Sequence, residues 1–457
     1  MGKHHYFLTF SCCLFVSAGW FLLPNPYMVV VVALLPLAFL FTINATFLLI
    51  TLFVVFSFFR IHEALPFLYS LKIPLMLSLG SMCALLWHLV VTKKIDIYWT
   101  HEQTVMSLFF ILVAIGVVMA GNRPVALTYF TAIYWKIALM SFAILLLTRE
   151  QQHFAYSARI YVISGSLVAV VALMNKVSGI GLVEGSRVTI GRDFGSVLGD
   201  PNDLSLVLMF PAAFATSLLL SPRMTPLSRL LGGIGIILIL LAILATQSRG
   251  GMLGILAVFA VFAYRNIKSK ALLISLGMVV AAGMFVMAQM SERSFGGNTE
   301  VGVDESSMGR LYAWQAAFRM AVDNPLTGVG IDNFYYNYFY YSAHWDGLNH
   351  AVHSTWFGIL AETGFLGLLV FIYLIAVLIS SCRRSLSLIE KNRATVPADI
   401  YMSAQALLAG LAGTVVSGTF LTQGFTWPIY ILAALVIALG QWCRTHIRST
   451  SRTGRCA

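Results

Sequence analysis

Three arginines stand out because each lies in a short polar stretch between long apolar segments. Arg187 and Arg192 belong to SRVTIGRDFGSVLGDPN at residues 186–202, and Arg249 belongs to TQSRGG at residues 246–251. Any one of them could simply extend its guanidinium to lipid headgroups. A planar guanidinium also matches the geometry of phosphate oxygens. Together the three arginines would neutralise a diphosphate, and their pattern therefore indicates a phosphate-binding site.

A histidine begins the segment HSTWFGILAETGFLGLL at residues 353–369, where a long apolar stretch starts. His353 could merely cap or anchor the helix that follows it. A neutral imidazole near pH 7 can also accept a proton from a hydroxyl group. We predict that His353 is a general base, with His350 and His344 as weaker alternatives in the same loop.

A carboxylate, Glu362, lies nine residues after His353, well inside the apolar stretch. At about 100° per residue, it falls on the opposite face of a continuous helix and is not expected to orient the imidazole. A carboxylate at this depth is costly in a bilayer and normally has a partner. We favour a structural ion pair, with Lys136 or Lys72 as its partner, and a backbone group as the alternative.

Metal and nucleotide signatures are absent from the sequence. It contains no HExxH or CxxC pattern, and the polar segments hold no closely spaced carboxylates that stand out as ligands. It also lacks a P-loop and a Rossmann fingerprint. We therefore expect no metal and no cofactor, so that energy comes from the substrate or from an ion gradient.

The elements that position these residues must be membrane helices, because 59% of the 457 residues are hydrophobic and only 10% are charged. One span needs roughly 20 apolar residues to cross a hydrocarbon core about 30 Å thick. Candidate spans cover 6–23, 27–43, 44–60, 66–92, 104–121, 125–148, 159–180, 203–221, 228–246, 250–264, 270–290, 354–381, 402–420 and 425–443. If 27–43 and 44–60 form one re-entrant hairpin, the count falls from fourteen to twelve. The sequence predicts an all-α integral membrane protein with 12 to 14 transmembrane helices.

The basic residues recur in alternate loops, as the positive-inside rule requires. If Lys3 is cytoplasmic, 18 of the 29 lysines and arginines share its side: residues 3, 93, 94, 149, 159, 223, 229, 265, 268, 270, 383, 384, 391, 393, 444, 448, 452 and 455. Most acidic residues then fall on the other side. We expect a multi-pass protein of the bacterial inner membrane, with both termini cytoplasmic. The same distribution argues against nucleic acid as a partner, despite a net charge of +11.

The chain is expected to form one membrane domain over residues 1–457, with two periplasmic loops that are long enough to build a site. The first, residues 181–202, carries Arg187 and Arg192. The second, residues 291–353, is the larger. The polar residues with possible chemistry therefore gather on one side of the membrane, and we predict a periplasmic active site.

The larger loop is predicted to contain an amphipathic helix at the membrane surface. Leu311, Trp314, Phe318 and Ala321 repeat at helical spacing, and the helix should end before Pro325. The aromatic run FYYNYFYYSAHW follows at residues 334–345. This run is typical of an interfacial aromatic belt, and it could also provide surfaces on which sugar rings stack.

Taken together, these segments resemble the O-antigen ligase and O-antigen polymerase superfamily of bacterial envelope enzymes. The order and spacing match across roughly residues 180–370. The matching features are Asp200-Pro-Asn202, Ser248-Arg249-Gly250, SSMGRLYAWQAAFRMAVDNPLTGVGIDNF at residues 306–334, His353-Ser, Glu362-Thr-Gly364 and Gly367. The first half of the chain resembles the family only in being hydrophobic.

The resemblance implies a metal-independent, inverting glycosyltransferase of the membrane GT-C type. Its donor would be a glycan on undecaprenyl diphosphate, and its preferred acceptor a hydroxyl of lipid A core. Arg249 and one of Arg187 or Arg192 would bind the diphosphate, while His353 would activate the acceptor. Arg310 would supply further phosphate or headgroup contacts in a supporting role.

The acceptor is the point at which this sequence departs from the ligase pattern. Ligases commonly have Asn or a similar residue after the histidine, whereas Ser354 follows His353 here. The donor glycan could therefore pass to lipid A core, to another lipid-linked repeat unit as in a polymerase, or to a protein hydroxyl.

Two further classes remain as alternatives. A lipid-linked glycan transporter would make use of the intramembrane Lys72, Lys136 and Glu362, but transporters concentrate their polar groups near the midplane rather than at one face. A multi-span peptidoglycan polymerase would require a catalytic carboxylate in an outer loop. Asp304, Asp332 and Asp346 are the candidates for that role.

The absence of a metal signature predicts that chelation leaves activity unchanged. Glycan transfer by the purified protein should be the same in EDTA as in buffer alone, because guanidinium groups rather than a metal would stabilise the leaving diphosphate. Loss of transfer in EDTA, followed by recovery on addition of Mg²⁺ or Mn²⁺, would contradict this expectation.

Overall fold

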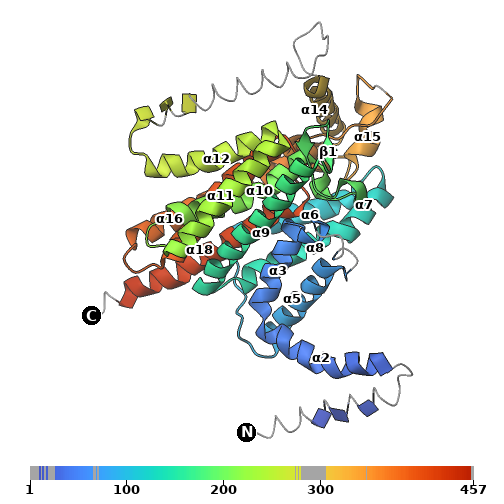
Figure 1. The fold of residues 1–457 in the computed structure, drawn as a ribbon. Helices are drawn as coiled ribbons and strands as arrows, with labels where there is room; N and C mark the ends of the chain where they lie inside the picture. Colours follow the sequence, from blue (N-terminus) through green and yellow to red (C-terminus); the bar gives the residue numbers. More distant parts are fainter. Residues whose placement is uncertain are drawn as a thin grey trace.

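A computed structural model describes residues 10–11, 13–14, 17–18, 26–64, 68, 71–272, 274–275, 277–278, 305–345 and 347–453 of the chain. Almost all regular structure in these residues is helical (Figure 1). Their one sheet is a hairpin of β1 (Leu182–Val183) and β2 (Arg187–Val188), which pair antiparallel. The all-α fold class predicted from composition is thus consistent with the structure.

The helices follow one another with short connections. Those before the hairpin are α2 (Pro26–Asn44), α3 (Thr46–Phe58), α4 (Ile61–Ala64), α5 (Ile73–Val90), α6 (His101–Met119), α7 (Arg123–Tyr129), the π-helix η2 (Phe130–Tyr134), α8 (Trp135–Leu147) and α9 (Gln151–Ser178). Two 3₁₀ turns, η3 (Arg192–Phe194) and η4 (Val197–Gly199), come after the hairpin. The later helices are α10 (Pro201–Leu220), α11 (Pro226–Thr246), α12 (Arg249–Asn266), α14 (Glu305–Asp323), α15 (Phe334–Tyr341), α16 (Thr355–Lys391), α17 (Ala398–Gly418) and α18 (Trp427–Thr453).

Three helices, α10, α17 and α18, form the centre of the bundle. In each of them 83% of the most apolar stretch is buried inside the protein, against 39% for the peripheral helices α9 and α11. The two central helices α17 and α18 are the least apolar of the candidate spans, whereas the peripheral α11 is among the most apolar. Helices that pack against other helices in a membrane favour small and polar residues, and helices that face lipid favour large apolar ones. α9, α11 and α12 pack against α10, and α16 packs against α17 and α18.

Nine helices of the described residues are long and apolar enough to cross a membrane, and the bent pair α2–α3 raises the number to ten if it forms one span. The two helices meet at an angle of 86°, which fits the predicted re-entrant hairpin of 27–43 and 44–60. The expected spans at 6–23 and 270–290 lie largely outside the described residues. The expected span at 250–264 corresponds to the helix α12, which is not among the nine, so its crossing of the membrane stays a prediction. The total of 12 to 14 spans stays a prediction.

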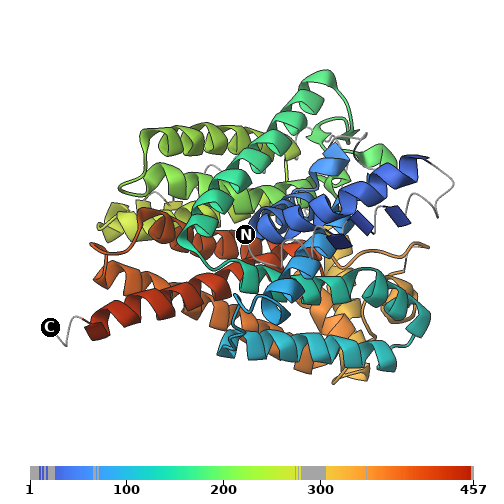
Figure 2. The same cartoon turned by 90° about the horizontal axis from the view of Figure 1, so that it is seen from below.

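The ends of the helices separate two groups of charged residues. At one end, Arg159 pairs with Asp399 at 3.1 Å, Arg265 pairs with Glu390, and Arg384 and Arg444 both lie 3.7 Å from Glu102. We call this the far end. The hairpin and the starts of α10, α12 and α16 lie at the other end, which we call the site end. Figure 1 shows the hairpin, α14 and α15 there, opposite the C-terminus, and Figure 2 shows the same separation from below.

Helix α16 changes direction at Gly364, whose φ of 69° and ψ of −171° interrupt the helical backbone. The connection between α14 and α15 packs against this break. The amide of Phe365 donates to the Pro325 carbonyl at 2.8 Å, and the amide of Val329 donates to the Ala361 carbonyl, also at 2.8 Å. A β-carbon at Gly364 would lie 2.5 Å from the Pro325 oxygen, so only glycine fits there. The break therefore joins the Asn324–Phe334 loop to a membrane helix.

The predicted helix of the larger loop is present as α14, and it ends at Asp323, before Pro325 as expected. The face that packs against the protein coincides only partly with the predicted apolar stripe. Leu311 and Phe318 are exposed, whereas small residues and one methionine, namely Ala313, Ala316, Ala317, Met320 and Ala321, are buried. Short side chains let α14 lie close to α16, which leaves the bulky residues outside. The position of α14 at the membrane surface stays a prediction.

Candidate functional site

The site is built around the first turn of α10. Asp200 caps this helix, because its carboxylate accepts hydrogen bonds from the amides of Asn202 at 2.7 Å and Asp203 at 3.2 Å. Pro201 occupies the first helical position, where its missing N–H leaves no donor unpaired. The Asp-Pro-Asn sequence thus fixes the orientation of Asn202 at the site end.

Asn202 joins two of the segments singled out in the sequence. Its side-chain oxygen accepts hydrogen bonds from the guanidinium of Arg187 at 3.0 Å and from the hydroxyl of Ser248 at 2.8 Å. The same Arg187 donates through Nε to the Thr246 carbonyl at 3.2 Å. The Arg187 side chain is therefore held against the boundary between α11 and α12, although about sixty residues separate the two segments.

Arg249 begins α12, directly after Ser248, which caps that helix by accepting from the Gly251 amide at 3.1 Å. The Arg249 side chain is exposed at the site end. Arg192 lies on η3 and is also exposed, and it donates to the Gly199 carbonyl at 3.2 Å, just before Asp200. The three predicted arginines thus surround one short stretch of chain, residues 199–202.

His353 approaches this stretch from α16. The backbone on either side of it is anchored: the Trp314 indole donates to the Val352 carbonyl at 3.0 Å, and Ser354 caps α16. His353 itself has a φ of 44°, a left-handed conformation that is uncommon for residues other than glycine. A backbone conformation of this kind is retained where the surrounding contacts hold it, so the loop fixes the backbone at His353.

A second set of hydrogen bonds ties the start of α16 to α10. The Gln423 side chain donates to the Asp203 carboxylate at 2.7 Å, and the Gln423 amide donates to the Thr355 hydroxyl at 3.0 Å. Thr355 in turn donates to the Leu421 carbonyl at 2.7 Å. The connection between α17 and α18 therefore links the histidine segment to the Asp-Pro-Asn corner. The sequence analysis missed Gln423, since nothing near it resembles a motif.

The charges around His353 favour its neutral form. Burial lowers the pKa of His353, and the positive charge of Arg310 on α14 lowers it further. The Asp200 carboxylate opposes this effect, while His350 adds to the lowering. His353, Arg310 and Asp200 are thus close enough to interact electrostatically. A neutral imidazole can accept a proton at neutral pH.

Glu362 lies apart from this cluster. Its buried carboxylate accepts hydrogen bonds from the backbone amides of Asp332, Asn333 and Phe334, the last at 3.1 Å. Among the described residues no ion pair joins it to Lys136 or Lys72, so the backbone alternative applies rather than the favoured ion pair. Glu362 supports the site indirectly, because it holds the loop that leads into α15.

The rival histidines are engaged by aromatic rings. His344 stacks on Tyr312 with ring centres 4.0 Å apart, and His350 meets the edge of Tyr338 at 5.4 Å. Of the carboxylates proposed for a peptidoglycan polymerase, Asp304 and Asp346 lie outside the described residues. Asp332 lies beside Glu362 rather than beside His353, and burial raises its pKa.

The first half of the chain supplies a charged group that sequence reasoning overlooked. Arg60 pairs with the buried Glu63, whose other carboxylate oxygen accepts from the Ser196 hydroxyl, and the positive charge of Arg60 also acts on Asp203. The cluster thus fastens the Arg192 loop to α3 and α4. The polar sequence RIHE between two apolar stretches was the available signal.

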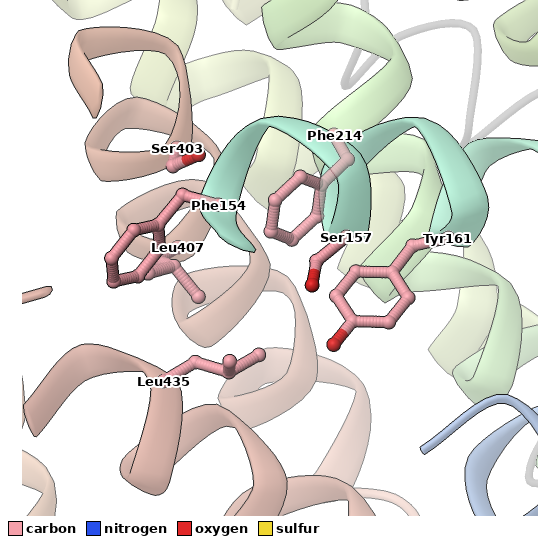
Figure 3. A pocket seen from close by; sticks show the side chains of 7 residues that line it. All are labelled: Phe154, Ser157, Tyr161, Phe214, Ser403, Leu407 and Leu435. Carbon is pink, nitrogen blue, oxygen red and sulfur yellow. The ribbon is translucent and has the colours of Figure 1, made fainter. Parts of the chain in front are cut away.

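A small pocket lies away from this site. It is lined by Phe154, Ser157 and Tyr161 of α9, Phe214 of α10, Ser403 and Leu407 of α17, and Leu435 of α18 (Figure 3). Its volume of about 10 Å³ is at the lower limit for a single water molecule. The pocket is therefore too small to hold a lipid or a sugar. Within the described residues, no three His, Cys, Asp or Glu side chains form a cluster that could bind a metal ion.

The fold and the site define a polytopic helical membrane protein with a cluster of arginines and one histidine at one end of the bundle. Residues 234–372 match the family model for O-antigen ligase, and this match supports the O-antigen ligase superfamily. The matched range contains Arg249, Arg310, His353 and Glu362, whereas Arg187 precedes it. The resemblance identified from the motifs is thereby confirmed. A comparison with curated proteins gave no match.

The contacts of Glu362 predict a stability effect that depends on its acceptor oxygen. Glu362→Ala leaves buried backbone amides without an acceptor, which costs about 1–3 kcal/mol for each unsatisfied group. Glu362→Gln keeps one carbonyl oxygen for the same amides and should be destabilised less. Thermal unfolding of the purified protein in detergent measures both variants. If Glu362→Ala proves as stable as Glu362→Gln, the carboxylate does not hold the Asp332–Phe334 backbone.

Proposed function

We propose that this protein is a glycosyltransferase that moves a glycan from undecaprenyl diphosphate to an acceptor hydroxyl, with lipid A core as the preferred acceptor. The observation that carries the proposal is the gathering of three arginines and His353 around Asp200–Asn202. The match to the O-antigen ligase family supports the same class of reaction. The site end would face the periplasm of the bacterial inner membrane, and both termini would be cytoplasmic.

The arginines would bind the leaving group. Arg187 is oriented by Asn202 and Thr246, and Arg249 extends from the start of α12. Guanidinium groups that are fixed before the reaction stabilise charge that develops on a departing diphosphate. Arg192 and Arg310 would add positive charge at the edge of the same site. Since the donor is already activated by its diphosphate, the proposed reaction needs neither a metal nor a nucleotide.

His353 would act as the general base. The acceptor oxygen attacks the anomeric carbon of the donor as the bond from that carbon to the diphosphate oxygen breaks. The electron pair of the broken bond leaves with undecaprenyl diphosphate, and the acceptor proton passes to His353. Attack opposite the leaving group inverts the anomeric centre in a single displacement. The neutral imidazole favoured by burial and by Arg310 suits this role.

The direct test is glycan transfer by the purified protein in detergent, with undecaprenyl-diphosphate glycan as donor. His353→Ala should lower kcat by about 10²–10⁴-fold through loss of the base, and Arg249→Ala by about 10²–10³-fold through loss of one charge-stabilising donor. Arg223→Ala and His446→Ala, at the far end, are matched controls that should transfer normally.

The products of the same assay separate the acceptors. A single increase in the mass of lipid A core means a ligase, whereas a ladder formed without lipid A core means a polymerase. Transfer to a hydroxyl-rich protein substrate alone means a protein O-oligosaccharyltransferase. If His353→Ala and Arg249→Ala transfer as well as the wild type, the assigned roles are wrong. No transfer from the lipid-linked donor to any of these acceptors would overturn the proposed reaction.

The charges that face His353 predict opposite pH effects. Activity requires the neutral imidazole, so it is lost as pH falls through the pKa of His353, which burial and Arg310 lower from the ordinary value for histidine. Arg310→Gln removes a positive charge and should raise that pKa, moving the acid limb of kcat/KM to higher pH. Asp200→Asn keeps an acceptor for the helix cap but removes a negative charge, and should move the limb to lower pH. Shifts in the same direction, or no shift, would contradict His353 as the titrating base.

A further inference from the structure

The turn between α17 and α18, residues 419–426, contacts the starts of two helices that hold site residues. Its Thr419 hydroxyl accepts from the indole of Trp356 on α16 at 3.1 Å. On α12, a β-carbon added to Gly250, the second residue of that helix, would lie 3.2 Å from Cβ of Phe420. The α17–α18 turn therefore packs against the first turns of both α12 and α16.

Gln423, in the middle of this turn, is 7% exposed and makes hydrogen bonds in two directions. Its Nε2 donates to the Asp203 carboxylate of α10 at 2.7 Å, and its backbone amide donates to the Thr355 hydroxyl of α16 at 3.0 Å. Asp203 directly follows Asn202, and Thr355 lies two residues after His353. One residue therefore connects the helix start that orients Arg187 with the helix start that follows the histidine.

The Gln423 side chain is held at both of its polar atoms. Its Oε1 accepts from the Thr426 hydroxyl, which leaves Nε2, a donor only, to face the Asp203 carboxylate. The backbone of the turn is held as well, because the next residue, Gly424, accepts through its carbonyl from the buried Tyr430 hydroxyl at 2.7 Å. A side chain with a partner at each end has one defined position, so Gln423 can act as a fixed spacer.

We propose that Gln423 is a positioning residue of the transfer reaction, which fixes the distance between His353 and the arginines that bind the diphosphate. This inference rests on the proposed function, because the base and the leaving group come from there. The acceptor is held by the base and the donor by the arginines, so both must be aligned when the new bond forms. Gln423 is buried between protein groups and acts through them rather than on a substrate.

A positioning role affects the rate of reaction and donor binding differently. A misplacement of about 1 Å between reacting groups can lower a rate by about 10²-fold, even when its cause lies outside the site. Donor binding depends on the arginines, and Arg187 stays bonded to Asn202 and Thr246 when Gln423 is changed. Loss of the Gln423 side chain should therefore lower kcat and leave the KM for the donor unchanged.

A second buried glutamine provides a matched control. Gln405 of α17 is 3% exposed, donates to the Tyr401 hydroxyl at 2.9 Å and accepts from the Ser221 hydroxyl at 3.1 Å, towards the far end. Gln423→Leu should lower kcat for glycan transfer by about 10²-fold and change the donor KM by less than about twofold. Gln405→Leu loses the same kind of hydrogen bonds and should transfer normally. An equal loss of kcat in both variants, or a raised donor KM at unchanged kcat in Gln423→Leu, would overturn the proposal.

The direction of the hydrogen bond allows a rescue experiment. Gln423→Glu places a second carboxylate against Asp203, and like charges so close repel, so kcat should fall as in Gln423→Leu. Adding Asp203→Asn restores a pair of one amide and one carboxylate, with the donor now on α10, and the Thr426 hydroxyl can still donate to residue 423. The double variant should recover most of the lost kcat. A double variant no faster than Gln423→Glu alone would contradict the positioning role.

Amide hydrogen exchange of the purified protein in detergent measures the same link without turnover. Peptides from residues 199–206 and 353–358 should exchange faster in Gln423→Leu than in the wild type, because both helix starts lose a shared anchor. In Gln405→Leu both peptides should exchange as in the wild type. Unchanged exchange of both peptides in Gln423→Leu would overturn the link. Faster exchange in that variant, together with no glycan transfer by the wild type, would refute the proposed function and leave the link standing.

Discussion

One side-chain oxygen, Oδ1 of Asn202, holds the site together. Inside or beside a bilayer, backbone that leaves the helical conformation must satisfy its polar groups within the protein. Three non-helical segments meet at the site end, and two of them converge on Asn202 through Arg187 and Ser248. The Asp200 cap fixes the backbone that carries this oxygen. The position of the arginines therefore follows from how the start of α10 is capped and paired.

The sequence predicted the parts of the protein that depend on local composition. Long apolar runs predicted most of the membrane spans, and basic residues in alternate loops predicted that one end of the bundle is rich in basic residues. The polar segments between the apolar runs indicated the three arginines and His353 as candidate site residues. The separation of far-end pairs such as Arg159–Asp399 from the site agrees with the predicted alternation. The end of α14 before Pro325 was also predictable, because proline cannot continue a helix.

The remaining features depend on contacts between distant residues, which local patterns do not encode. The Gln423 side chain donates a hydrogen bond to the Asp203 carboxylate, although the two residues lie far apart in the sequence. Likewise, the Glu63 carboxylate accepts a hydrogen bond from the hydroxyl of Ser196, which lies in a loop more than a hundred residues later. Glu362 is bound by amides that any residue could provide, so no partner was visible in the sequence. The face of α14 that packs against the protein was not predicted, because small residues such as Ala313 and Ala317 make that contact, whereas the sequence analysis considered only the stripe of mainly large apolar residues at the membrane surface. In a bilayer, outward-facing leucine and phenylalanine meet lipid at no cost, which weakens hydrophobicity as a guide to burial.

Helices α9 and α11 touch at two levels. The Arg159 guanidinium donates to the Ser228 hydroxyl at 3.2 Å at the far end, and a β-carbon on Gly235 would lie 2.7 Å from Cγ1 of Val162 nearer the middle. Two contacts along one pair of helices oppose a tilt of either helix against the other. Because Arg187 donates to the Thr246 carbonyl at the end of α11, this pair would move as one rigid body in any displacement and would carry that arginine with it.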